Sequence, residues 1–172
     1  MLLAYFICVL LYIIFDFVSR LVNKTRHKKK INRLLATVNT KDELLYMRET
    51  EILNMLALLF QRKGYKVKTT DKCGEFVNGL LLDDVIFVEL QKNSPKHLLE
   101  IETAIKFTYC MQQASIHRGM LITLGDFKLN TKLYCHKYVI ECVNGDQLLA
   151  MIREVRMQTD PVKIKQPRLS NP

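Results

Sequence analysis

The hydrophobic pattern divides the chain into an apolar leader, a basic stretch and a series of helix-like and strand-like segments. Residues 1–15 have no charged side chain, and residues 20–33 contain seven Lys or Arg and no acid. A helix that crosses a bilayer needs about 20 apolar residues, and its basic flank stays on the cytoplasmic side. We therefore expect a single-pass transmembrane helix over residues 1–19, with the N-terminus outside the cell membrane and the C-terminal domain in the cytoplasm.

A cleaved signal peptide is the alternative interpretation of the leader. Such a peptide carries its positive charge before the apolar stretch and a small-residue cleavage site after it. Here the order of charge is reversed and no such site follows Phe15, so the pattern favours an uncleaved anchor. The basic run sets the topology and can contact anionic lipid, and it does not by itself indicate nucleic-acid binding.

Beyond the basic stretch, the pattern predicts one folded domain over residues 42–157. Residues 20–41 are expected to form a juxtamembrane linker, and the Pro-rich, basic residues 158–172 a disordered tail. Helical spacing of apolar residues predicts helices, and alternation or short apolar runs predict strands. The predicted helices span residues 43–63, 98–116, 129–137 and 146–157. The predicted strands span residues 65–70, 76–82, 85–91, 119–124 and 138–143.

The order of the predicted elements is α-β-β-β-α-β-α-β-α. Asp83-Asp84 separates two strand-like runs and so predicts an antiparallel hairpin. A strand–helix–strand segment after a hairpin indicates a mixed sheet with helices packed against it. The predicted fold class is therefore α/β.

Composition and charge limit the function classes. The chain is 49% hydrophobic with only six Gly and four Pro among 172 residues, so it can bury a core. Its net charge of +9 is concentrated near the ends, because residues 34–152 contain 14 basic and 14 acidic side chains. The domain therefore lacks the excess positive charge that is usual in duplex-binding proteins. The five cysteines are widely spaced without C-x-x-C, which predicts free thiols and no zinc site.

Six short motifs follow one another in a fixed order over roughly residues 45–152. They are a Gly-Tyr helix end, a Val-x-x-Thr strand, a Gly-containing turn, a strand ending in Glu-Leu-Gln, a Thr-x-x-x-Phe segment, and an apolar strand followed by Asn-Gly and Leu-Leu. The matching residues are 64–65, 67–70, 73–79, 88–91, 123–127 and 139–149. In this order the motifs resemble the Mrr-like branch of the PD-(D/E)xK nuclease superfamily. The resemblance implies a restriction-endonuclease-like mixed sheet flanked by helices, and an interaction with DNA.

The resemblance also implies positions for a catalytic site. The family uses an acid on the hairpin, an acid two residues before a lysine on the next strand, and often a glutamate on the first helix. Carboxylates of this kind bind Mg²⁺, which activates water and neutralises phosphate, and the lysine stabilises charge on the reacting phosphate. The positions correspond here to Asn78, Glu89, Gln91 and Glu51, with Glu49 as the alternative in another register.

Two of these positions have lost their charge. Asn78 stands in place of a carboxylate, and Gln91 stands in place of the lysine. Lys92 is one residue further on and is expected to point to the opposite face of the strand. Glu89 and Glu51 remain as the Mg²⁺ ligands if the site is active. Acids that could substitute for the missing ligand are Glu75, Asp83 and Asp84, although a solvated hairpin turn is the simpler interpretation of the last two.

We therefore expect a membrane-anchored, cytoplasm-facing protein that interacts with DNA and whose endonuclease activity is lost or weakened. Loss of one charge at a metal site commonly costs a few kcal/mol in the barrier, and two losses favour an inactive site. Two alternatives remain open. One is an active, Mg²⁺-dependent DNA endonuclease, and the other is an inactive scaffold in a membrane protein complex, which the neutral charge of residues 34–152 favours over strong DNA binding.

Overall fold

The computed structural model describes residues 12, 15–17, 26, 28–70 and 79–159. The predicted membrane anchor therefore lies mostly outside the described residues, and so does nearly all of the predicted tail. Among the helices that the structure does describe, none combines the length and the apolar character that a bilayer crossing requires.

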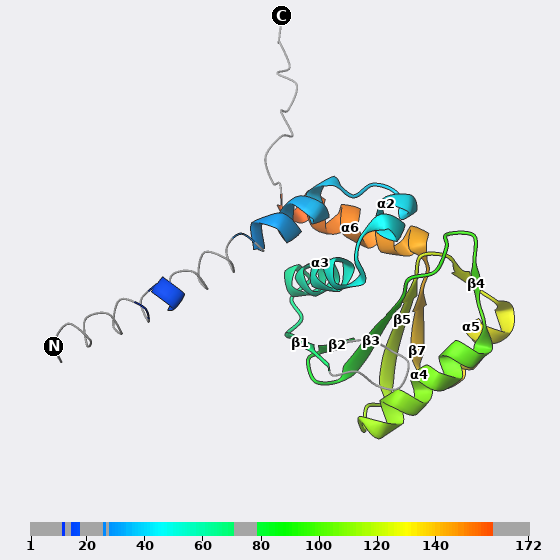
Figure 1. Cartoon of the computed structure of the whole chain (residues 1–172). Helices are drawn as coiled ribbons and strands as arrows, with labels where there is room; N and C mark the ends of the chain where they lie inside the picture. The colour runs from blue at the N-terminus through cyan, green and yellow to red at the C-terminus, as the bar shows by residue number, and fades with distance from the viewer. Residues whose placement is uncertain (1–11, 13–14, 18–25, 27, 71–78, 160–172) are drawn as a thin grey trace, which may run out of the picture.

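A mixed sheet of five strands forms the centre of the molecule (Figure 1). The strands are β1 Val67–Thr69, β2 Leu80–Leu82, β3 Ile86–Gln91, β5 Arg118–Thr123 and β7 Ile140–Val143, in the spatial order β1-β2-β3-β5-β7. The first three strands are antiparallel, and β3, β5 and β7 run parallel. The predicted α/β class and mixed sheet are confirmed.

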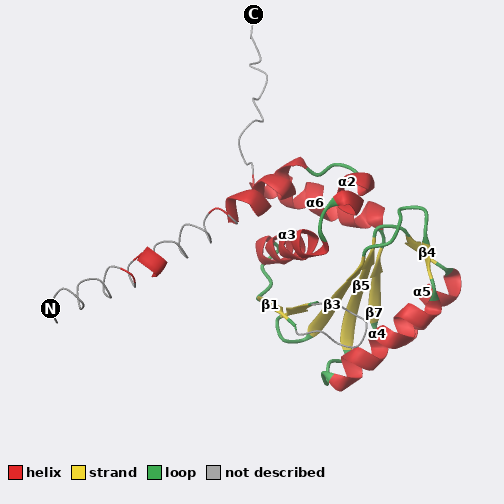
Figure 2. Ribbon diagram, in the orientation of Figure 1, coloured by secondary structure: helices red, strands yellow, loops and turns green. Residues whose placement is uncertain are grey.

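Helices cover both faces of the sheet (Figure 2). On one face lie α3 Glu49–Arg62 and α6 Gly145–Thr159, with the short helix α2 Lys41–Tyr46 beside α6. On the other face lie α4 Ile101–Gln113 and α5 Leu129–Lys137. Each face has its own apolar core, because side chains alternate along a strand. Val88 and Leu90 of β3 join the core under α3 and α6, whereas Phe87 joins the core under α4 and α5.

The hairpin predicted at Asp83-Asp84 is present and joins β2 to β3. Both residues have positive φ angles, 54° and 61°, which is the backbone geometry of a tight hairpin turn. Asp83 accepts a hydrogen bond of 2.7 Å from the backbone N–H of Lys66, and Asp84 pairs with Lys68 at 2.5 Å. These acids therefore stabilise the turn, as the simpler interpretation expected.

The single helix predicted over residues 43–63 is two helices. The chain is extended at Met47 and Arg48, and α3 begins again at Glu49. The carboxylate of Glu51 accepts a hydrogen bond of 3.4 Å from the backbone N–H of Arg48, which caps the new helix. Apolar periodicity continues through this break, and so the periodic pattern does not reveal it.

The helix predicted over residues 98–116 begins later than expected. Leu98–Leu99 form the short strand β4, which pairs in parallel with β6 Asp126–Phe127, and α4 starts at Ile101. Gly125 allows the two segments to meet, because a Cβ atom there would lie 2.0 Å from the carbonyl oxygen of His97. A strand of two residues has no periodicity, so its pairing is visible only in three dimensions.

The predicted linker over residues 20–41 is folded in its second half. Residues 28–37 are helical, and Ile31, Leu35 and Val38 are buried in the core under α3 and α6. Leu35 is fully buried, so the domain begins before residue 42. The lysines around these apolar residues gave the segment the appearance of a solvated linker, although the spacing of Ile31 and Leu35 matches one helix face.

Arg156 of α6 holds the end of this first helix. Its guanidinium donates to the carbonyl oxygen of Leu35 at 2.5 Å, to the carbonyl oxygen of Val38, and to the side chain of Asn39 at 2.8 Å. The two carbonyls lie at the C-terminal end of a helix, where backbone acceptors lack intrahelical partners. One side chain therefore joins the first and last helices of the domain.

Replacing Arg156 should destabilise the domain measurably. Arg156→Ala leaves two backbone carbonyls without their charged donor, so we expect the free energy of unfolding to fall by about 2 kcal/mol or more. Arg153→Ala is the matched control, because Arg153 is an exposed arginine on the same helix. Chemical denaturation measures both. Equal stability of the two variants would contradict the assigned role.

Candidate functional site around Glu89

Glu89 is a buried carboxylate near the carboxyl end of the central strand β3. The residue is 2% exposed. Alternation along the strand turns Glu89 and Gln91 to the side opposite Val88 and Leu90. Among the described residues, no group hydrogen-bonds to Oε2 of Glu89. Buried polar atoms are almost always hydrogen-bonded. An oxygen without a partner in the described part of the chain, such as Oε2 of Glu89, is therefore a candidate ligand for a bound cation.

Gly79 provides the space for the carboxylate. Its backbone N–H donates to Oγ1 of Thr70 at 3.0 Å, and its carbonyl accepts from the N–H of Thr70 at 3.0 Å. A Cβ atom on Gly79 would lie 2.7 Å from the carbonyl oxygen of Val88 and 3.0 Å from Oε2 of Glu89. The backbone of Gly79 thus lies directly against the carboxylate, and a larger residue would displace it.

The electrostatics of the pocket disfavour the charged form of Glu89. Burial, and secondly the negative charge of Glu49, raise the pKa of Glu89 from 4.5 to about 8. Without a cation, the carboxyl group is therefore mostly protonated at neutral pH. A positive ion bound at this carboxylate would oppose the shift, because it favours the ionised form.

The helix acid that acts on Glu89 is Glu49, the alternative register of the sequence analysis. Glu51 instead accepts from Lys30 at 2.6 Å and from Arg48 at 2.9 Å. The hydrogen bonds from Arg48 and Lys30 lower the pKa of Glu51 to about 2. Its charge is thus already neutralised by two cations, whereas the negative charge of Glu49 contributes to the raised pKa of Glu89.

The remaining predicted positions divide into two groups. Gln91 is the last residue of β3 and lies on the same side of the strand as Glu89. Lys92 donates to the carbonyl oxygen of Met47, just before α3, so its ammonium group lies on the opposite side, as predicted. Asp83 and Asp84 lie at the other end of β3, in the hairpin turn. Asn78 and Glu75 lie outside the described residues.

The residues present fit a divalent cation in part. Mg²⁺ takes oxygen ligands and is often bound by only one or two carboxylates plus water and phosphate oxygens. Glu89 offers an orphaned oxygen, and Glu49 acts on it through its negative charge. Within the described residues, no cluster of three or more acids, His or Cys is assembled. A bound Mg²⁺ would supply an activated water and charge neutralisation, and it would rely on few protein ligands.

Comparison with known proteins gives one result of note. No protein-family model matches the chain, and no curated protein sequence matches it. Among solved structures, the fold is similar to that of the MspJI restriction endonuclease in complex with a 27-mer oligonucleotide. The match covers 80% of this chain and 32% of that one, with 12% sequence identity and a TM-score of 0.45. The chain thus spans about a third of that endonuclease, and the likeness assigns no role to its residues.

Sequence reasoning located Glu89 and the opposite orientations of Gln91 and Lys92, but it missed Gly79 and Thr70 as parts of the site. Gly79 ended a predicted turn motif, and a glycine within a strand pair is a known sign of close backbone approach. The close approach of the Gly79 backbone could therefore have been predicted from the sequence. The bonds that neutralise Glu51 depend on Lys30, which is 21 residues away, and they had no signal in the sequence.

The raised pKa of Glu89 predicts a pH-dependent stability. Below pH 4.5, the pKa of Glu89 in the unfolded chain, the carboxyl group is protonated in both states and the folded state bears no cost. As the pH rises towards about 8, the pKa in the folded state, the unfolded chain ionises first and the free energy of unfolding falls. At pH 7 and without divalent cations, the loss is on the order of 3 kcal/mol. Glu89→Gln should remove this slope, so the variant should be more stable than the wild type at pH 8 and above.

Thermal unfolding from pH 5 to pH 9 in EDTA measures this difference. Glu102→Gln is the matched control, because Glu102 is an exposed acid on α4. Parallel curves of melting temperature against pH for the wild type and Glu89→Gln would mean that Glu89 titrates normally.

Proposed function

We propose that this is a membrane-anchored, cytoplasm-facing protein of the Mrr-like nuclease fold that interacts with DNA, and that its endonuclease activity is lost or weakened. The observation that carries the proposal is the orphaned carboxylate oxygen of Glu89. It lies on the strand position that the sequence resemblance assigns to a metal-binding acid. The mixed sheet, with an antiparallel hairpin leading into a parallel βαβ unit, supports the same assignment.

The chemistry of the site favours binding over cleavage. Phosphodiester hydrolysis in this family uses a lysine beside the phosphate in addition to the metal ion, because negative charge builds up on the phosphate oxygens during the reaction. The side chain at the lysine position is the neutral Gln91. Lys92 cannot compensate, since the carbonyl oxygen of Met47 holds its ammonium group on the other side of the strand. Glu89 and Glu49 can still attract Mg²⁺ and, through it, a phosphate group.

Two alternatives follow from specific observations. The carboxylate of Glu89, unpartnered at Oε2 within the described residues, favours an active, Mg²⁺-dependent endonuclease if Gln91 orients the water. The equal numbers of acids and bases in residues 34–152 favour an inactive scaffold in a membrane protein complex. The proposed protein binds DNA with little cleavage, the active endonuclease cleaves it, and the scaffold does not bind it. One assay can distinguish these three outcomes.

The assay incubates the full chain in detergent with supercoiled and linear DNA, in Mg²⁺, Mn²⁺ or EDTA. The wild type should retain DNA with a steep loss of affinity as salt rises, and it should cut little or none. Gln91→Lys restores a cation on the side of Glu89, so this variant should gain metal-dependent cleavage. The double variant Gln91→Lys with Glu89→Gln should lose that gain.

Gln112→Lys serves as the matched control, because it adds the same charge at an exposed position of α4. Cleavage by the wild type that disappears in Glu89→Gln would identify an active endonuclease. If the wild type neither cuts nor retains DNA, the scaffold function would replace the proposal.

Membrane anchoring has its own test. The full chain should remain in the membrane pellet after extraction with alkaline carbonate, because a spanning helix is held by its apolar residues and not by charge. Removal of residues 1–19 should release the protein while leaving the basic residues 20–33 in place. Carbonate-soluble full-length protein would show that the leader does not anchor the chain.

A further inference from the structure

A second polar cavity lies at the edge of the sheet, away from Glu89. It has a volume of about 320 Å³ and lies against β7, which is separated from β3 by β5. Its polar lining comes from β6, α5, β7 and the start of α6. The lining polar residues are Asp126, Lys132, His136, Cys142, Asn144 and Gln147.

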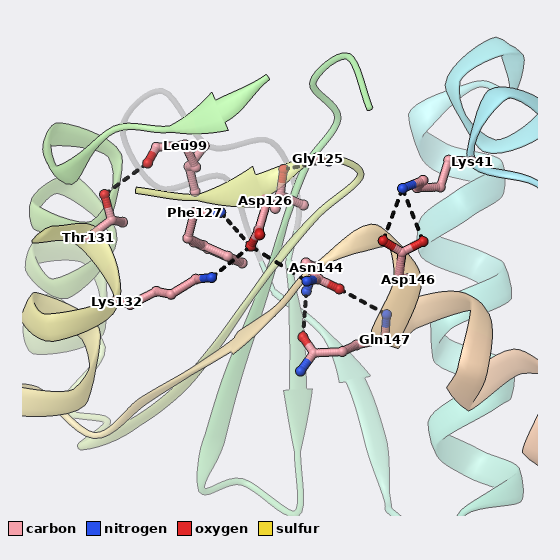
Figure 3. Close-up of polar contacts among 11 residues, drawn as sticks. Lys41, Leu99, Gly125, Asp126, Phe127, Thr131, Lys132, Asn144, Asp146 and Gln147 are labelled. Carbon is pink, nitrogen blue, oxygen red and sulfur yellow. Dashed lines mark hydrogen bonds and ion pairs between the residues drawn. The ribbon is translucent and has the colours of Figure 1, made fainter. Parts of the chain in front are cut away.

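The walls of this cavity are fixed by hydrogen bonds (Figure 3). Asp126 accepts from the backbone N–H of Phe127 at 2.8 Å and pairs with Lys132 at 3.0 Å. Asn144 and Gln147 exchange two bonds of 2.9 Å between side chain and backbone, which caps α6. Asp146, two residues further on, pairs with Lys41 at 3.0 Å.

Two free thiols lie close to one another at this cavity, and one of them lines it. Cys135 of α5 is fully buried, whereas Cys142 of β7 is partly exposed and lines the cavity. The two side chains pack together in the core under α4 and α5, where each thiol influences the pKa of the other. The expectation of free thiols is wrong for Cys110, which is disulfide-bonded.

The surroundings make the two thiols unequal. The hydrogen bond from Cys135 and the charge of Lys132 lower the pKa of Cys142, although burial and the acids Asp126 and Glu141 oppose this. The same contact, together with burial, raises the pKa of Cys135. A thiolate is the reactive form of cysteine. The accessible sulfur is thus the more nucleophilic of the pair, and the buried one holds its proton.

We propose that Cys142 is a site of oxidation by peroxides and that Cys135 is its resolving thiol. The Cys142 thiolate attacks one oxygen of a hydroperoxide, the O–O bond breaks, and the sulfur becomes a sulfenic acid while water or an alcohol leaves. The Cys135 sulfur then attacks the sulfenic sulfur, loses its proton, and releases water as the disulfide forms. Two thiols are oxidised, and one peroxide is reduced.

The arrangement suits this sequence of events. Cys142 faces the cavity, where a small peroxide can reach it, and Cys135 lies behind it, in contact and shielded from solvent. The product would join α5 to the edge strand β7 by a covalent bond. This site is independent of Glu89 and of the proposed interaction with DNA, so either can fail without the other.

The test treats the full chain in detergent with a small excess of hydrogen peroxide, blocks the remaining thiols and digests the protein with trypsin without reduction. Cleavage after Lys132, Lys137 and Arg153 places the two cysteines on separate peptides, residues 133–137 and 138–153. We expect these two peptides to be recovered as one disulfide-linked species. Iodoacetamide without peroxide should label Cys142 before Cys135.

Four variants make the result specific. Cys135→Ala should abolish the linked species and leave a sulfenic acid on Cys142 that dimedone traps. Cys142→Ala should abolish both products. Lys132→Gln should slow alkylation of Cys142, whereas Lys128→Gln should not, because Lys128 pairs with Glu100 instead. The proposal is overturned if peroxide leaves Cys142 unmodified, if Cys135 is labelled first, or if Cys142 pairs with a different cysteine.

Discussion

A carboxylate buried without a partner costs free energy unless it takes up a proton or binds a cation, and Glu89 is in that position. It lies on β3, the strand where the sheet changes from antiparallel to parallel pairing. On one side, Gly79 brings its backbone against the carboxylate, and on the other, β5 fixes the strand. The fold thus holds the carboxylate of Glu89 at a position where no described residue donates a hydrogen bond to its Oε2 atom.

The rest of the site explains why binding is favoured over catalysis. The negative charge of Glu49 adds to the effect of burial on Glu89, and both negative charges favour a cation at this site. The side chain that follows on the same face, Gln91, carries no charge, and the nearest lysine in sequence is held on the opposite face by the Met47 carbonyl. A metal could thus be attracted together with a phosphate, whereas charge that develops during hydrolysis would lack a protein cation at this position.

The sequence predicted the elements in which periodicity and local chemistry agree. Helix α5 has the predicted bounds, and the hairpin at Asp83-Asp84 forms as its turn residues indicated. Elements defined by distant contacts were missed. The helix over residues 28–37 is held by core packing and by Arg156, more than 100 residues away. The same limit applies to the site: strand alternation predicted the directions of Gln91 and Lys92, but the choice between Glu49 and Glu51 depended on Lys30, from another helix.

The most direct test of this account is a site-resolved titration of Glu89. Carboxyl carbon chemical shifts, assigned by comparison with Glu89→Gln, can be followed against pH in EDTA and again in Mg²⁺. The account predicts a pKa near 8 in EDTA and a clear decrease in Mg²⁺, because the cation favours the ionised carboxylate. A pKa near the ordinary 4.5 in EDTA, unchanged by Mg²⁺, would contradict the claim that Glu89 is a buried carboxylate in need of a cation.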